Sequence, residues 1–133
     1  MVAPGWAVQQ ALYQTLAAHP PLRAAVTGIF DYVPRKQALP YITVGEAVET
    51  DWSAKDFSGR EHRLSVHVWS GYRGMAEAKD LLGLVDEALE HMPAALDGHL
   101  LVSLRFLSAR VMVDAEEEVR HGIADYRART VRE

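Results

Sequence analysis

The chain contains no cysteine, which excludes a disulfide framework and any site built on a thiolate. It also lacks an apolar run near the ~20 residues that a membrane-spanning helix needs. Its first residues do not show the basic stretch and apolar run of a signal peptide. We therefore expect no membrane span and no leader segment.

Positive charge is not in excess, because 14 Lys and Arg stand against 18 Asp and Glu, for a formal net charge of -4. Binding to nucleic acid is driven by neutralising phosphates, so this balance argues against a general nucleic-acid binder. It does not exclude a protein past which DNA slides without being gripped.

What is present is ordinary globular composition, with 49% hydrophobic and 24% charged residues in 133 positions. A chain of this length can bury one continuous core. It shows no internal repeat, low-complexity tract or linker. We therefore expect a single domain that spans residues 1–133.

Two stretches have helical periodicity. Between Gly5 and Ala18 apolar residues recur every fourth position, and His19-Pro20-Pro21 ends the pattern because proline cannot continue a helix. A short turn of helix is expected around Leu22 to Val26. A longer helix is expected between Gly74 and Pro93, where the apolar stripe is formed by Ala78, Leu81, Leu82, Val85, Ala88, Leu89 and Met92.

β-rich runs predict strands at Ile29–Val33, Leu39–Val44, Arg63–Trp69, Leu100–Val113 and Val119–Val131. The alternation slips near Ser108-Ala109, which indicates a bulge. The polar stretch Glu46–Glu61 is interpreted as the distal part of a long hairpin, far from the helices. Few buried contacts would hold it, so we expect it to be mobile in an isolated subunit and ordered in an assembly.

These elements predict an α+β fold: a two-layer sandwich of a mainly antiparallel sheet with two amphipathic helices on one face and a long projecting hairpin. Neighbouring strands joined by short links are expected to pair antiparallel. The predicted core consists of Leu12, Leu16, Val66, Val68, Leu81, Leu82, Val85 and Leu89.

The sequence contains no recognisable catalytic or metal-binding motif. None of the six histidines forms the close sequence pairs of zinc motifs, and His62 and His67 lie five apart in one strand, so they point to opposite faces. Scattered surface or half-buried histidines are the better interpretation. Ser70 lacks the preceding glycine of a nucleophile elbow, and the segment Gly71 to Gly74 lacks the glycine pattern and lysine of a phosphate loop. We predict no catalytic residue, no bound metal and no cofactor.

Three groups of residues are candidates for a protein interface. Trp52 and Phe57 are large aromatics in a polar hairpin, and they either pack locally on the sheet or form a contact surface. The run 114–118 lacks the ligand pattern of a calcium loop and is typical of a solvated acidic turn. Arginines on the last hairpin stand opposite it, and intrachain pairs account for some of them. The candidates are Trp52, Phe57, Asp114, Glu116, Glu117, Glu118, Arg127 and Arg129.

Several segments together resemble the phage tail completion, or tail terminator (head-tail joining), family of long-tailed phages, prophages and gene-transfer particles. They are Ala11-Leu12-Tyr13 with Leu16 and Leu22, Val33-Pro34, Leu39-Pro40-Tyr41-Ile42, His67-Val68-Trp69-Ser70, Gly74 with Glu77-Ala78, Arg120-His121-Gly122 and Tyr126-Arg127-Ala128-Arg129. Each segment is short, and their order and spacing over nearly the whole chain carry the resemblance.

The resemblance implies an α+β protein that is made in the bacterial cytoplasm and assembled into the tail of a phage-like particle. It implies a ring of six subunits at the head-proximal end of the tail tube, with the tube protein and a head-completion or stopper protein as partners and DNA passing through. It implies no enzymatic activity. The residues leave two alternatives open: a small dimeric α+β ligand-binding domain or enzyme, and a nucleic-acid-binding module that uses the arginines of the last hairpin.

Overall fold

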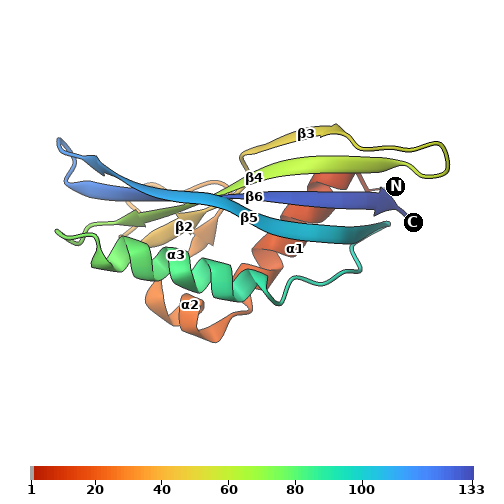
Figure 1. The fold of residues 1–133 in the computed structure, drawn as a ribbon. Coiled ribbons are helices and arrows are strands. Elements are labelled where there is room, and N and C mark those ends of the chain that lie inside the picture. Colours follow the sequence, from red (N-terminus) through yellow and green to blue (C-terminus); the bar gives the residue numbers. More distant parts are fainter. Residues whose placement is uncertain (1) are drawn as a thin grey trace.

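The structure, a computed structural model, describes residues 2–133 and consists of one six-stranded sheet and three helices (Figure 1). The elements, in chain order, are α1 (Pro4–Ala17), α2 (Pro20–Ala25), β1 (Ile29–Phe30), β2 (Tyr41–Thr43), β3 (Ala47–Asp51), β4 (Gly59–Ser70), α3 (Ala76–Leu89), β5 (His99–Asp114) and β6 (Val119–Arg132). The predicted α+β fold with a mainly antiparallel sheet is confirmed.

The strand order is β1-β2-β4-β6-β5, and β3 also pairs with β4. The two ends of β4 have different partners, because Arg60 lies opposite Asp51 of β3, whereas His67 lies opposite Thr43 of β2. One edge of the sheet is therefore β5 alone, and the other edge is shared by β1 and β3.

The antiparallel rule fails for the first two strands, since β1 pairs with β2 in parallel. The loop between them runs back toward the start of β1, where the Thr27 hydroxyl donates to the carbonyls of Ala38 (2.6 Å) and Pro40 (3.1 Å). Both strands therefore begin at the same level. They are also shorter than the sequence predicts, at two and three residues.

The helices lie close to their predicted positions. The short turn predicted near Leu22 is α2, and it starts earlier than expected, at Pro20, because the fixed φ of proline suits the first turn of a helix. The long helix α3 ends at Leu89, four residues before Pro93. Figure 1 shows α2 and α3 on one side of the sheet, with α1 crossing toward β3.

The predicted core is confirmed, because none of its eight side chains is more than 9% exposed. Residues from β6 that the prediction left out complete the layer under α3. Tyr126 is among them, and its hydroxyl donates to the Asp86 carboxylate at 3.0 Å. Burial raises the pKa of Tyr126, and the nearby Asp86 raises it further.

The β5–β6 ladder contains two register shifts, between Leu101 and Ser103 and between Phe106 and Ser108. The second is the bulge that the sequence predicts near Ser108. The first adjoins the apolar run Leu100-Leu101-Val102. Because all three residues are apolar, the sequence does not show which of them points to which face of the sheet.

The expectation that the hairpin 46–61 lies far from the helices is wrong. β3 passes the N-terminal end of α1, so that a Cβ on Gly5 would lie only 2.6 Å from the Glu49 Oε1 atom. Glycine allows this approach because it has no side chain.

Candidate interaction surface

One face of the sheet is covered by the helices, and we call the opposite face the outer face. Along β4 the side chains of His62, Leu64, Val66 and Val68 are buried, while those between them are more exposed. Because successive side chains of a strand point to opposite faces, the intervening residues lie on the outer face.

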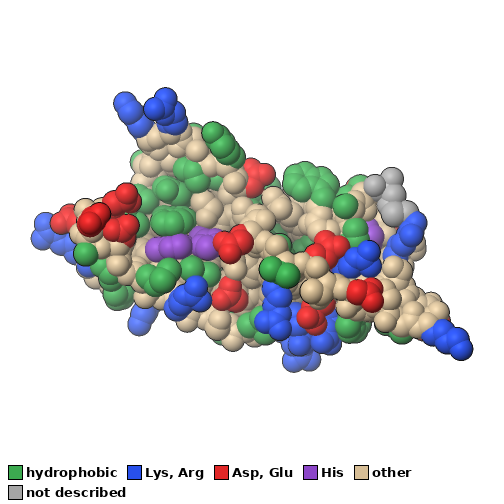
Figure 2. Space-filling model, turned by 90° about the horizontal axis from the view of Figure 1, so that it is seen from above, with side chains coloured by type: hydrophobic (Ala, Val, Ile, Leu, Met, Phe, Trp, Pro, Cys, Tyr) green, Lys and Arg blue, Asp and Glu red, His purple; other side chains and the backbone are tan. Residues whose placement is uncertain are grey.

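Two histidines meet on the outer face. His67 Nδ1 and His121 Nε2 are 2.7 Å apart and hydrogen-bonded, and His67 Nε2 lies 3.2 Å from the Glu46 carboxylate. The Trp69 and His121 rings stack with centroids 3.7 Å apart. Figure 2 shows histidine side chains at the surface beside hydrophobic and acidic ones. The pKa of His121 is lowered by burial and by the proximity of His67.

The spacing of the sequence did not predict this pair, because the two histidines are 54 positions apart and meet only through the β4–β6 register. A usable signal existed, since both belong to segments that carry the family resemblance. Within residues 2–133 no three His, Asp or Glu side chains are placed to hold a metal ion.

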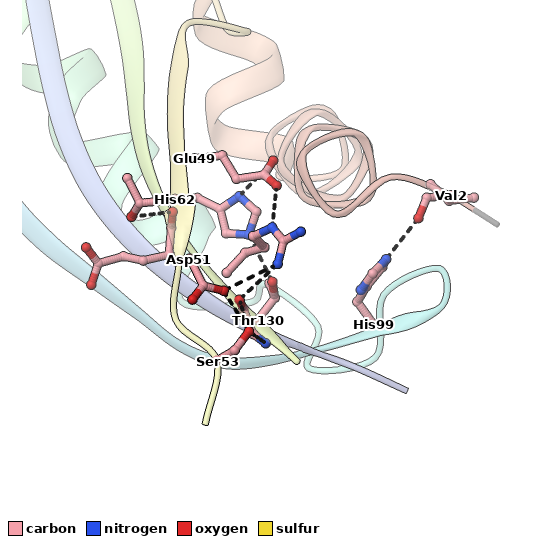
Figure 3. A network of polar contacts seen from close by, with 11 residues as sticks. Val2, Glu49, Asp51, Ser53, His62, His99 and Thr130 are labelled. Atoms are coloured by element: carbon pink, nitrogen blue, oxygen red, sulfur yellow. Dashed lines mark hydrogen bonds and ion pairs between the residues drawn. The ribbon is translucent and has the colours of Figure 1, made fainter. Parts of the chain in front are cut away.

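Two other histidines are buried, which contradicts the expectation of surface or half-buried histidines. His62 Nε2 is hydrogen-bonded to the Thr130 hydroxyl at 2.9 Å, and His99 Nε2 to the Val2 carbonyl at 2.9 Å (Figure 3). Burial lowers the pKa of His62, and the nearby Glu49 partly opposes this effect. His99 thus joins the N-terminal end of the chain to the sheet, whereas His62 links β4 to β6.

Trp52 and Phe57 lie in the turn between β3 and β4. Their ring centroids are 5.5 Å apart, and the Arg129 guanidinium lies 5.0 Å from the Trp52 centroid. Trp52 is half-buried, whereas Phe57 remains 38% exposed. Trp52 therefore packs locally on the sheet, and Phe57 is the member of the pair that faces solvent.

The predicted arginines differ in their surroundings. Arg129 Nε donates to the Glu61 carboxylate at 3.0 Å, so it is neutralised within the chain. Arg127 lies between Arg63 of β4 and Arg105 of β5 in the strand register. Its Nε is buried and has no hydrogen-bond partner among the described residues.

The acidic turn, Asp114–Glu118, connects β5 to β6 and is exposed throughout. The Asp114 carboxylate accepts the backbone N–H groups of Glu116 (3.1 Å) and Glu117 (3.2 Å), which fixes the turn. Within residues 2–133 none of its carboxylates forms an ion pair. The expected pairing with arginines of the same hairpin is therefore not found.

The edge strand β5 is long and carries exposed apolar side chains. Its first residues also pair with the preceding loop, since the Leu101 N–H donates to the Ala94 carbonyl at 2.7 Å, and beyond Leu101 the side of β5 that faces away from β6 is open. Val102 is 54% exposed. The other exposed apolar residues of the strand are Leu100, Phe106, Leu107, Met112 and Val113. A strand edge of this kind is a template for pairing with another chain.

The described residues also form open cavities. A groove of about 410 Å³ between α1 and β1 is lined by Gln9, Gln14 and Asp31 among others, and a depression of about 630 Å³ adjoins His67 and His121. The lining of the depression also includes Thr43, whose hydroxyl accepts a hydrogen bond from Trp69 Nε1 at 3.1 Å. No helix of the described chain has the length and hydrophobicity that crossing a membrane requires.

Comparison with known proteins places this fold. A family model described as tail completion protein gp17 matches residues 10–131. The tail completion protein gp17 of Bacillus phage SPP1 is 29% identical over 121 residues, which cover 91% of this chain and 90% of that protein. The solved structure of SPP1 gp17 superimposes with a TM-score of 0.68 at 28% identity, covering 93% of this chain and 88% of that one.

A second solved structure is more similar. It is a chain in the virion of a native gene transfer agent (GTA) particle, with a TM-score of 0.89 and 32% identity over 98% of this chain and 99% of that one. These matches confirm the resemblance drawn from the sequence. The chain belongs to the tail completion protein gp17 family of virion structural proteins.

Proposed function

We propose that this single-domain chain forms a closed ring of six subunits at the head-proximal end of a phage-like tail. There it ends polymerisation of the tail tube and joins the tail to the head connector. Its partners are copies of itself, the tail tube protein and a head-completion or stopper protein. Membership of the family and the similarity to a chain of a gene transfer agent virion support this role.

The observation that carries the ring is that the sheet has two unlike open edges. One edge is β5, which is long and apolar, and the opposite edge includes β3, all of whose residues are exposed. Contacts between unlike surfaces are head-to-tail, and they generate closed rings when the rotation between neighbours closes. Two identical edges would instead favour a two-fold dimer.

The predicted interface residues then have distinct roles in this proposal. Phe57 supplies an exposed aromatic anchor toward a partner, while Trp52 and Arg129 hold the turn that presents it. The acidic turn and Arg127 present opposite charges that face each other across the contact between neighbouring subunits. The net charge of -4 suits a ring through which DNA passes without being gripped. We propose a purely structural role with no enzymatic turnover.

The decisive test is imaging of intact particles at a resolution that resolves subunits. We expect six copies of the chain around the DNA path, between the tail tube and the head. A different place in the particle, or a ring that threads no DNA, contradicts the proposal.

A variant tests the role of the β5 edge. Val102→Lys places a charge on the exposed apolar edge, which should reduce the number of tailed particles because a buried, unpaired charge opposes strand pairing. Tyr72→Lys is the matched control, since Tyr72 is also exposed but lies in the loop between β4 and α3, outside both edges of the sheet. Equal particle yields from both variants would count against β5 as an interface.

A further inference from the structure

Three arginines form a row across the outer face, which we call the arginine row: Arg63 of β4, Arg127 of β6 and Arg105 of β5. The strand register places Arg127 directly opposite each of the other two. Like charges in directly opposite positions destabilise a sheet unless something neutralises them. An anionic partner that binds the row would therefore stabilise the sheet.

Within residues 2–133, none of the three guanidinium groups forms an ion pair, and the Nε of Arg127 is buried without a partner. The nearest carboxylates on the same face are already engaged. Glu61 accepts from Arg129, and Asp125 accepts from the Ser65 hydroxyl at 2.6 Å and lies 3.7 Å from Arg110. The row is thus the unneutralised part of a face whose other arginines are paired.

The acidic turn is the complementary group, with four exposed carboxylates and no ion pair among the described residues. It cannot reach the arginine row of its own chain. Val119 and Arg127 are eight residues apart on one extended strand, which corresponds to roughly 26 Å at about 3.3 Å per residue. Figure 1 shows the β5–β6 turn projecting at one end of the molecule.

We propose that the acidic turn of one subunit binds the arginine row of the next. This inference rests on the proposed ring and names one contact that closes it. Each subunit offers one turn and one row, so every group is used once in a closed head-to-tail ring. Arg63 and Arg105 thereby become interface residues, and the positive charge of Arg127 between them is also neutralised.

Protein carboxylates fit the row better than DNA phosphates do. Glu61 and Asp125 flank the row along the strands, and they would repel a phosphate backbone that runs across the sheet. The chain as a whole is acidic, with a net charge of -4. A compact turn instead delivers its carboxylates to the row alone, and bidentate arginine–carboxylate contacts are specific in geometry.

A charge exchange in producing cells tests the contact. The row variant is Arg63→Glu/Arg105→Glu, which spares the partly buried Arg127, and the turn variant is Glu116→Arg/Glu117→Arg, which spares the turn-forming Asp114. Each variant alone should lower the fraction of heads that carry tails by roughly tenfold or more, because like charges then meet. Both sets in one chain should restore joining, as should co-expression of the two variants, because every contact again pairs opposite charges.

The matched control is Arg23→Glu/Arg35→Glu, which makes the same change of charge at exposed arginines outside the sheet and should leave joining unchanged. If the combined chain joins no better than either variant, the proposal is wrong. A defect in the row variant with normal joining in the turn variant also overturns it, and points to DNA or another protein on the row. If the ring is present and both variants join heads to tails normally, only this contact is refuted. If wild-type particles contain no ring of this chain, the proposed function is refuted.

Disulfide trapping gives a second measurement that leaves every charge in place. The chain has no cysteine, so Ser108→Cys, next to the row, and Ala115→Cys, in the turn, introduce the only thiols. Seven residues of extended strand separate them, which prevents a bond within one chain. Oxidation of purified particles should yield a ladder of linked copies up to a closed ring, and a result of monomers alone contradicts the contact.

Discussion

The Arg129 guanidinium lies 5.0 Å from the centroid of the Trp52 ring, while its Nε donates to Glu61 at 3.0 Å. These contacts join the turn between β3 and β4 to β6, which lies in the interior of the sheet. The hairpin therefore has an anchor that its polar sequence does not reveal. The mobility of residues 46–61 in the isolated subunit remains a prediction, which the hydrogen bonds from Ala54 N–H to the Phe57 carbonyl (3.1 Å) and from Arg132 N–H to the Ser58 carbonyl (2.9 Å) oppose.

Replacing Trp52 by alanine should loosen this turn. A cation–π contact at a partly exposed site contributes about 0.5–1 kcal/mol, so amide exchange at Trp52 should accelerate by roughly two- to fivefold. That amide donates to the Gly59 carbonyl at 3.0 Å and reports the closure of the turn. Phe57→Ala is the control, because Phe57 is more exposed and does not contact Arg129 through a cation–π interaction. Unchanged exchange in Trp52→Ala would show that the anchor contributes nothing.

A pair of glycine variants tests the packing of α3 on the sheet. A Cβ on Gly122 would lie 2.6 Å from Val68 Cγ2 and 3.1 Å from Leu82 Cδ1, so Gly122→Ala should destabilise the fold by about 1–3 kcal/mol. A Cβ on Gly83, in the middle of α3, meets nothing within 4 Å. Gly83→Ala should therefore stabilise by about 0.5–1 kcal/mol. Chemical denaturation measures both, and a destabilised Gly83→Ala would contradict the position of this helix face.

The core was predictable because its signals are local. The three- and four-residue spacing of Leu81, Leu82, Val85 and Leu89 indicates one face of a helix, and the alternation of residues around Val66 indicates a strand. The parallel pairing of β1 with β2 was not predictable, because it depends on how a loop folds back. Short strands joined by irregular loops carry too few residues for periodicity to fix their direction.

The candidate surface was predictable only in part, for the same reason. The acidic turn is contiguous and is visible in the sequence, whereas the arginine row exists only through two strand registers, one of which, between β5 and β6, contains register shifts. Nothing in the sequence around Arg63 marks it as an interface residue, and Arg105 is one of several arginines on the last hairpin. The His67–His121 pair was missed because nothing in the spacing of the two residues indicates contact.

The helix assignment leads to a simple stability prediction. Leu89 of α3 is buried against the core, so Leu89→Ala should lower the free energy of unfolding by about 2–5 kcal/mol through lost contacts and the cavity left behind. Leu107→Ala, on the exposed part of β5, should change it by less than about 0.5 kcal/mol. Urea denaturation of the two variants separates these effects, and equal losses would be inconsistent with the packing.

The last prediction concerns stability at acid pH. Burial holds the pKa of His62 below its ordinary value of 6.5, and the neutral ring is hydrogen-bonded to Thr130. Above that value the ring is neutral in both the native and the unfolded chain, so it contributes no pH dependence. As the pH falls below it, the unfolded chain binds a proton that the native chain does not, and the free energy of unfolding decreases. The decrease levels off only below the native pKa.

His121 should add to this decrease, since its pKa is also lowered in the native state. Urea denaturation between about pH 7.5 and about pH 5 measures the slope, because this interval brackets the ordinary titration of histidine. His62→Gln should be less stable at neutral pH but should lose less stability on acidification, since it removes the proton that only the unfolded chain binds. His91→Gln, at an exposed position, should keep the wild-type slope. If the free energy of unfolding of His62→Gln falls on acidification with the wild-type slope as well, His62 is not the group that couples folding to pH.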